Sequence, residues 1–125
     1  MESPLSIRDK DDVVVVSFKE AKILDDASIR QLGQEFQNLW LQAAAGRKLL
    51  LDFSRVEFMS SAMIGQIMKL NTQCKKDKIR LILCNICPNI MEVFKITRLN
   101  KVLDIHPDGV KALEAFGPPA LGWKR

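Results

Sequence analysis

Two adjacent serines, Ser60 and Ser61, stand where an apolar segment gives way to a helical pattern. A serine at a helix start accepts a hydrogen bond from a free backbone N–H group of the first turn. The same N–H groups and the positive end of the helix dipole stabilise a phosphate on such a hydroxyl. A phosphoserine adds about two negative charges, so it would disfavour an acidic or apolar partner. The pair therefore suits a helix cap, a phosphorylation switch, or both at once.

The cysteines and the single histidine favour structural roles. Cys84 and Cys87 have the Cys-x-x-Cys spacing of zinc and redox sites, but a zinc site would need two more ligands, and only Cys74 and His106 remain. We interpret the cysteines as small buried hydrophobic residues, with redox sensitivity and metal binding as alternatives. His106 precedes a proline in a helix-capping loop, so a structural role is expected, with a proton shuttle as the alternative.

The aspartates do not form an obvious site. Asp52 follows an apolar segment, as the phosphoacceptor of a response-regulator receiver domain does, but that site also needs an acidic pair after the first strand and a lysine after a later one. Here Asp11 and Asp12 precede the first predicted strand, and residues 83–85 (LCN) contain no lysine. Together with the pair at 25–26, these aspartates could hold a metal only if the fold gathered them at one end of a sheet. An enzyme site would similarly have to gather Asp52, Ser61 and His106, which the strand order disfavours.

Length and composition limit the other functions. The chain has 125 residues, 47% of them hydrophobic, and a formal net charge of +4. One compact domain is expected, because enough apolar surface is available to offset the entropy of ordering the chain. The sequence contains no glycine-rich nucleotide loop and no Gly-x-Ser-x-Gly motif, so dinucleotide, P-loop and α/β-hydrolase chemistry are not expected. Three cysteines without an apolar leader indicate free thiols and a cytoplasmic protein.

The positive charge is concentrated in the second half of the chain. The first 62 residues are mildly acidic and the remainder is basic. Such an excess attracts phosphate, an acidic protein surface or anionic lipid, but a solvated helix end explains it equally well. Much of the excess comes from five nearby residues: Lys69, Lys75, Lys76, Lys78 and Arg80.

Strand-like and helix-like segments alternate along the chain. The predicted strands are short and apolar, as in a buried parallel sheet, and cover residues 13–18, 48–53, 79–84 and 102–105, with 21–24 able to pair with the first. Residues 48–53 should lie near the sheet centre. Helical spacing follows at 28–46, from the two serines to 74, at 87–94 and at 107–116. This order predicts an α/β fold with a mainly parallel sheet and right-handed crossovers.

The sequence resembles the STAS domain family, the anti-sigma factor antagonists of bacteria. The resemblance is carried by residues 49–65 (LLLDFSRVEFMSSAMIG), 81–85 (LILCN), 90–99 (IMEVFKITRL) and 102–105 (VLDI). It implies a mixed, mainly parallel sheet of four to five strands flanked by about four α-helices. The expected division is an N-terminal tail at 1–11, the STAS domain at 12–116 and a C-terminal tail at 117–125.

The resemblance also implies a mode of action without catalysis, cofactor or metal. In this family an unmodified antagonist binds an anti-sigma factor that is a GHKL-type serine kinase. Phosphorylation by that kinase ends the binding, and a PP2C-type phosphatase restores it. No nucleic acid and no membrane takes part directly.

The sequence departs from the family pattern at the serines. Antagonists typically have Asp-Ser-Ser/Thr-Gly there, with the second hydroxyl residue as phosphoacceptor. Here Ser60 replaces the aspartate, Ser61 aligns with the first serine, Ala62 takes the acceptor position and Met63 replaces the glycine. Ser61 is then the expected phosphorylation site, with Ser60 as second choice, and a surface Met63 suggests an altered partner contact. The expected partner-binding residues are Ser60, Ser61, Ala62, Met63 and Gln66; the alternative function is a non-phosphorylated STAS scaffold or ligand-sensing module.

Overall fold

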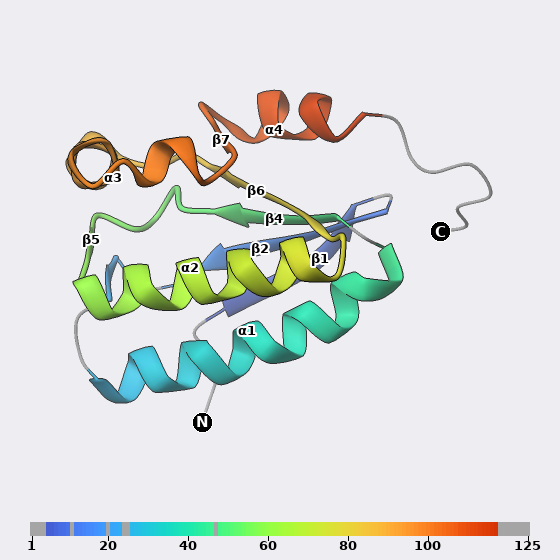
Figure 1. Cartoon of the computed structure of the whole chain (residues 1–125), viewed down its shortest axis with the longest axis horizontal. Helices are drawn as coiled ribbons and strands as arrows, with labels where there is room; N and C mark the ends of the chain where they lie inside the picture. Colours follow the sequence, from blue (N-terminus) through green and yellow to red (C-terminus); the bar gives the residue numbers. More distant parts are fainter. Residues whose placement is uncertain (1–4, 11, 20, 24–25, 47, 118–125) are drawn as a thin grey trace.

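A five-stranded sheet with helices on both faces forms the centre of the protein (Figure 1). The computed structural model describes residues 5–10, 12–19, 21–23, 26–46 and 48–117. The strands lie in the order β1 (Leu5–Lys10), β2 (Val13–Phe18), β4 (Lys48–Asp52), β6 (Arg80–Cys84) and β7 (Ile105–His106). β1 is antiparallel to β2, and every other neighbouring pair is parallel. The predicted mixed, mainly parallel sheet is therefore confirmed.

The central position of β4 follows from its composition. Leu49, Leu50 and Leu51 are all buried, because helices cover both faces of the sheet and side chains of a strand alternate between them. Val16 pairs with Leu51 on one side, and Leu83 pairs with it on the other. The expectation that the leucine-rich segment lies near the sheet centre is confirmed.

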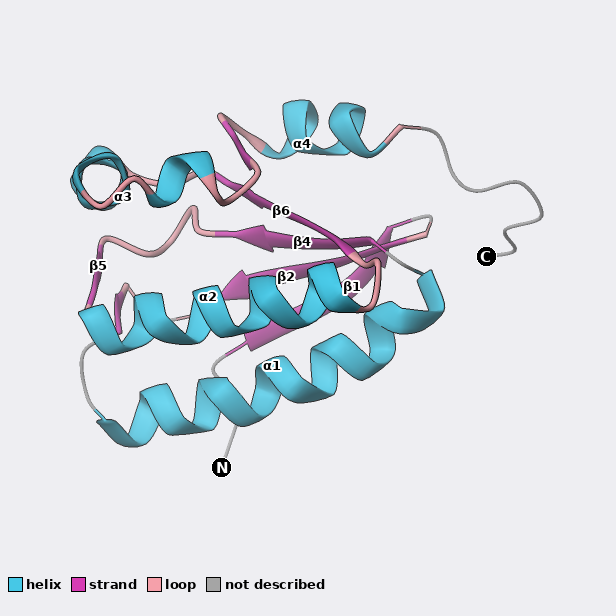
Figure 2. Ribbon diagram, in the orientation of Figure 1, coloured by secondary structure: helices cyan, strands magenta, loops and turns pink. Residues whose placement is uncertain are grey.

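The four α-helices of the described residues divide the core between the two faces (Figure 2). α1 (Asp26–Gly46) and α2 (Ser61–Lys76) cover one face, where α3 (Pro88–Ile96) also contributes buried side chains. α4 (Gly109–Phe116) covers the other face with Ala112 and Phe116. A short 3-10 helix, η1 (Leu99–Lys101), follows α3. None of the helices described is both long and apolar enough to cross a bilayer.

The expected N-terminal tail at 1–11 is wrong for residues 5–10, which form β1. Leu5 pairs with Phe18 and is 3% exposed, whereas Ile7 on the same strand is 42% exposed. β1 thus covers the outer edge of β2 through backbone hydrogen bonds and one buried side chain. Because these contacts need few apolar residues, a mostly polar segment can form such a strand. Asp11 and residues 1–4 lie outside the described residues.

Two other expected strands differ in position or partner. Residues 21–24 were expected to pair with the first strand, but β3 (Lys22–Ile23) pairs in parallel with β5 (Phe58–Met59) in a separate two-stranded sheet, and Leu24 lies outside the described residues. The last strand is only Ile105–His106, because Val102 closes the 3-10 helix. Of the expected C-terminal tail, residues 118–125 lie outside the described residues.

Replacement of Leu5 by alanine tests whether β1 is part of the folded domain. We expect Leu5→Ala to lower the free energy of unfolding by about 2–3 kcal/mol, because the side chain is buried in the core. Ile7→Ala, on the same strand but largely exposed, should cost less than about 1 kcal/mol. Urea unfolding followed by circular dichroism gives both values. Equal small effects would indicate that the strand contributes little to the core.

Candidate functional site

Asp52, the last residue of β4, organises the edge of the sheet from which the candidate site extends. Its Oδ1 accepts hydrogen bonds from the backbone N–H of Ser54 at 3.0 Å and from Nδ2 of Asn85 at 2.9 Å. Asn85 directly follows β6 and has a φ of 58°, a left-handed conformation that asparagine tolerates better than most residues. One carboxylate therefore joins the two loops that lead to α2 and α3.

The segment between β4 and α2 is fixed by both apolar and backbone contacts. Phe53 is fully buried and stacks on Phe18 with ring centroids 4.8 Å apart, and Val56 is also buried. Farther along, the N–H groups of Glu57 and Phe58 both donate to the carbonyl oxygen of Ala21, at 2.7 and 3.1 Å. These contacts hold β5 directly before the serines, so the start of α2 has a defined place.

Ser60 is the N-cap of α2, as its position in the sequence predicts. Its φ of −78° and ψ of 165° are extended, and its Oγ accepts from the N–H of Met63 at 3.4 Å. Its carbonyl oxygen accepts from the N–H groups of Met63 and Ile64. The Ser60 hydroxyl is thus occupied in the helix cap.

The expectation that Met63 is a surface contact is wrong. Its side chain is 0% exposed and belongs to the core beneath α1 and α2. Met63 begins the buried stripe of α2, which continues at Ile67, Leu70 and Cys74 with helical spacing. The methionine therefore anchors the first turn of the helix instead of meeting a partner.

Ser61 and Ala62 lie on the outside of the first turn. Both residues are exposed, and the Ser61 hydroxyl makes no hydrogen bond to any described residue. Gln66, one turn farther along, is half-buried because its side chain lies against Gly33 of α1. Of the five expected partner-binding residues, the structure thus leaves Ser61 and Ala62 exposed, Ser60 and Gln66 partly so, and Met63 buried.

The exposed apolar side chains of β5 and α3 were not predicted from the sequence. Phe58 of β5 is 45% exposed, with Nζ of Lys22 at 5.7 Å from its ring centroid. β5 contacts α3, on which Val93 and Ile96 are exposed, the latter at 76%. The sequence offered one indication for α3: Val93 and Ile96 do not share the helix face of the buried residues Ile90 and Phe94. Of these three side chains, Phe58 is the one that lies close to the serines in the sequence.

The cysteine side chains have the properties of core residues. Burial, with a smaller contribution from Asp52 and then Asp108, raises the pKa of the Cys84 thiol to about 12. Burial and then Asp77 raise the pKa of the Cys74 thiol to about 11. Both thiols are therefore neutral near pH 7 and are weak nucleophiles. Cys87 is partly exposed, and its Sγ lies 3.5 Å from the carbonyl oxygen of Glu57. No group of three metal-ligating side chains occurs among the residues described.

The acidic residues are distributed over both ends of the sheet. Asp12 is buried and pairs with Nζ of Lys48 at 2.8 Å, at the start of β4, whereas Asp52 ends that strand. Four residues of extended chain separate the two ends by about 13 Å. The acidic pair required for receiver-type phosphorylation of Asp52 is therefore not assembled from Asp12.

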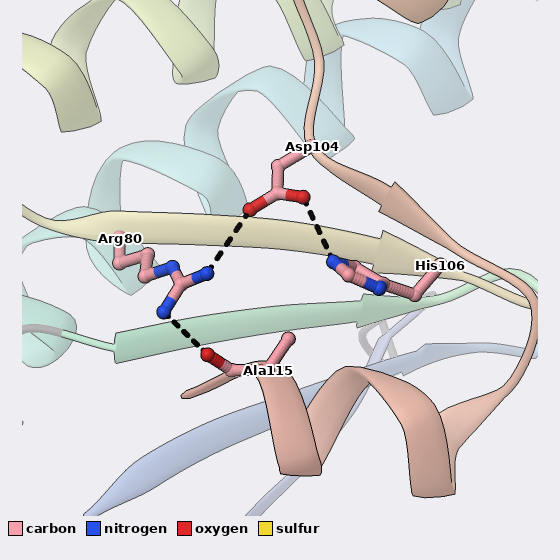
Figure 3. Close-up of polar contacts among 4 residues, drawn as sticks. All are labelled: Arg80, Asp104, His106 and Ala115. Atoms are coloured by element: carbon pink, nitrogen blue, oxygen red, sulfur yellow. Dashed lines mark hydrogen bonds and ion pairs between the residues drawn. The ribbon is translucent and has the colours of Figure 1, made fainter. Parts of the chain in front are cut away.

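His106 belongs to a separate polar cluster, shown in Figure 3. Its Nε2 lies 2.9 Å from Oδ1 of Asp104, whose Oδ2 pairs with Nη2 of Arg80 at 3.5 Å. The other Arg80 nitrogen, Nη1, donates to the carbonyl oxygen of Ala115, and the guanidinium lies over the Phe116 ring. These contacts attach the last turn of α4 to β6, which is a structural role.

Comparison with known proteins identifies the fold family. The model of the STAS domain matches residues 4–112. The chain belongs to the STAS domain family. BtrV of Bordetella bronchiseptica, a proposed anti-sigma factor antagonist, is 27% identical to this STAS domain over 95 residues, which cover 75% of this chain and 79% of BtrV.

Solved structures of anti-sigma factor antagonists share the fold of this STAS domain. One from Mycobacterium paratuberculosis superposes with a TM-score of 0.78 at 23% identity, covering 89% of this chain and 91% of that one. SpoIIAA of Bacillus in its phosphorylated form gives a TM-score of 0.67 at 18% identity, covering 90% and 98% of the two chains. At these identities the similarity shows a shared fold only. The candidate site is therefore inferred from the side chains described above.

Asp52→Ala should loosen the loop that leads to α2. Both donors to its Oδ1 lose a charged acceptor, so we expect a loss of about 1–3 kcal/mol in stability and faster hydrogen exchange at residues 53–59. Glu57→Ala is the matched control, because its side chain is exposed in the same loop and should matter by less than about 0.5 kcal/mol. Unchanged exchange in Asp52→Ala would contradict the proposed role.

Thiol labelling should distinguish the three cysteines. Near pH 8 we expect iodoacetamide to modify Cys87 first, because the raised pKa values and burial keep Cys74 and Cys84 protonated and covered. Cys74 and Cys84 should react only after unfolding in urea. Mass spectrometry of digested protein reports the order, and early labelling of Cys84 would argue against a purely structural thiol.

Proposed function

We propose that this STAS domain acts as an anti-sigma factor antagonist that is switched by phosphorylation of Ser61. It would bind an anti-sigma factor with GHKL-type serine kinase activity while Ser61 is unmodified. Phosphorylation by that kinase would end the binding, and a PP2C-type phosphatase would restore it. The protein would then be a substrate and a ligand of cytoplasmic partners and would not be a catalyst.

The observation that carries this proposal is the different environment of the two serine hydroxyls. Ser60 Oγ is occupied in capping the helix, while Ser61 is exposed in the first turn. A kinase needs an accessible hydroxyl, and a phosphate placed there would lie close to the helix N-terminus, whose dipole stabilises negative charge. Ser61 therefore meets both requirements without disturbing the cap.

The surroundings of Ser61 support the proposal that a phosphate there would end binding. Phe58 offers an exposed apolar side chain two residues before Ser60, and Ala62 is exposed directly after Ser61. A partner that covers this surface removes it from water, so about two added charges in its midst would carry a large desolvation cost. The known forms of relatives support the same chemistry, since SpoIIAA has been solved both unphosphorylated and phosphorylated.

Ala62 supports a second candidate function. It stands where antagonists usually carry the phosphoacceptor, so the domain would bind its partner without a phosphorylation cycle, as a STAS scaffold or ligand-sensing module. A partner that copurifies equally with wild type and with Ser61→Ala, independently of ATP, would favour this function.

Incubation with the cognate serine kinase and ATP tests the switch. We expect incorporation of one phosphate at Ser61, located by mass spectrometry, and none in Ser61→Ala. Ser60→Ala is the matched control, since it removes the neighbouring hydroxyl and about 1 kcal/mol of capping energy but leaves the acceptor. Ser61→Asp should weaken partner binding about tenfold or more. Phosphate that persists in Ser61→Ala, or full affinity of Ser61→Asp, would refute the switch.

A further inference from the structure

A cavity of about 580 Å³, widely open to solvent, lies between α1 and α2. The two helices pack side by side against the sheet (Figure 1), so the cavity is bounded by their adjoining faces over roughly two turns of each helix. Its floor is apolar, because Phe36 and Leu70 are buried core residues that line it from below. The expected partner contacts at Ser61 and Ala62 do not line it.

The walls of the cavity are polar and positively charged. Arg30 of α1 and Lys69 of α2 bring one cation from each helix, and none of the described residues that line the cavity has a carboxylate. The remaining polar lining consists of side-chain amides, which both donate and accept hydrogen bonds. They are Gln34, Gln37, Asn38, Gln66 and Gln73.

Gly33 of α1 leaves room for the Gln66 side chain of α2 at this wall. A glycine within a helix makes the helix less stable than an alanine would. The φ of Gly33 does not lie in the left-handed region, so the backbone conformation does not require glycine here. A Cβ at this position would lie 2.8 Å from Oε1 of Gln66. The Gln66 amide therefore lies in the space that a side chain at position 33 would fill, at the wall of the cavity.

We propose that this cavity binds a sugar phosphate. Arg30 and Lys69 would hold the phosphate, since guanidinium and ammonium groups make charge-assisted hydrogen bonds to its oxygens. The amides would pair with the sugar hydroxyls, which also both donate and accept. The apolar floor of Phe36 and Leu70 would contact the C–H face of the ring. Binding here would not depend on phosphorylation of Ser61, whose hydroxyl lies outside the cavity lining.

A titration with glucose 6-phosphate, followed by amide NMR shifts of the full chain, tests the site. We expect saturable shifts centred on residues 30–38 and 66–73, with a dissociation constant of about 1 mM or below for a ligand of this size. Glucose alone should give no saturation over the same range, and inorganic phosphate should bind about tenfold more weakly. Phosphate binding as tight as that of the ester would reduce the site to an adventitious ion only and overturn the proposal.

Variants of the lining separate the charges from the amide wall. Arg30→Gln and Lys69→Gln should each weaken glucose 6-phosphate about fivefold to tenfold, because each removes one cation. Gly33→Ala retains both cations but displaces Gln66, so we expect a loss of several fold with the helix intact by circular dichroism. Lys76→Gln, an exposed lysine of α2 that does not line the cavity, is the matched control and should bind as wild type. Equal loss in Lys76→Gln, or no loss in both cation variants, would show only nonspecific attraction and would overturn the site.

Discussion

The carboxylate of Asp52 is the contact on which the site depends, because a single oxygen serves two loops. Its Oδ1 accepts from the backbone of Ser54, which starts the path to α2, and from the side chain of Asn85, which starts the path to α3. Asparagine suits position 85 for two reasons: it tolerates a φ of 58°, and its side-chain amide donates the hydrogen bond to Asp52. An ionised acceptor makes stronger hydrogen bonds than a neutral one. The directions in which the chain leaves two adjacent parallel strands are therefore linked.

The residue that follows Asp52 belongs to an aromatic cluster that connects this polar contact to the rest of the core. Phe53, the residue after Asp52, stacks on Phe18 at the end of β2, and Phe18 meets Phe36 of α1 edge to face at 6.3 Å. Aromatic pairs in these geometries are stabilising beyond the area they bury. Because Phe36 also lines the cavity between α1 and α2, the same aromatic cluster contacts both the loop that leads to α2 and the floor of the cavity. A change in the packing of Phe36 would therefore alter the floor of the cavity and the contacts of Phe18 with the loop before α2.

The sequence shows the parts of this fold that depend on local periodicity and hides those that depend on distant partners. β2, β4 and β6 are predictable as apolar runs, and the helices as amphipathic segments with recognisable caps. β1 is not, since its pairing with β2 is made by the backbone and only Leu5 is fully buried. β3 and β5 have two residues each and exist because a remote strand supplies the hydrogen bonds. In α2 the helical period allows either Met63 or Ile64 to face the core, and only the position of α1 and the sheet decides in favour of Met63.

The burial of Met63 explains why the two serines differ. Its N–H group donates to the Ser60 hydroxyl while its side chain fills the core, so the same residue fixes the cap and the rotation of the helix about its axis. Successive residues of a helix are turned by about 100°, and with Met63 directed inward, Ser61 and Ala62 must face outward. A small residue such as glycine at position 63 would leave that rotation to other contacts. Met63 thus acts from inside the protein: Ser61 and Ala62 both face outward, and of these two residues only Ser61 carries a hydroxyl.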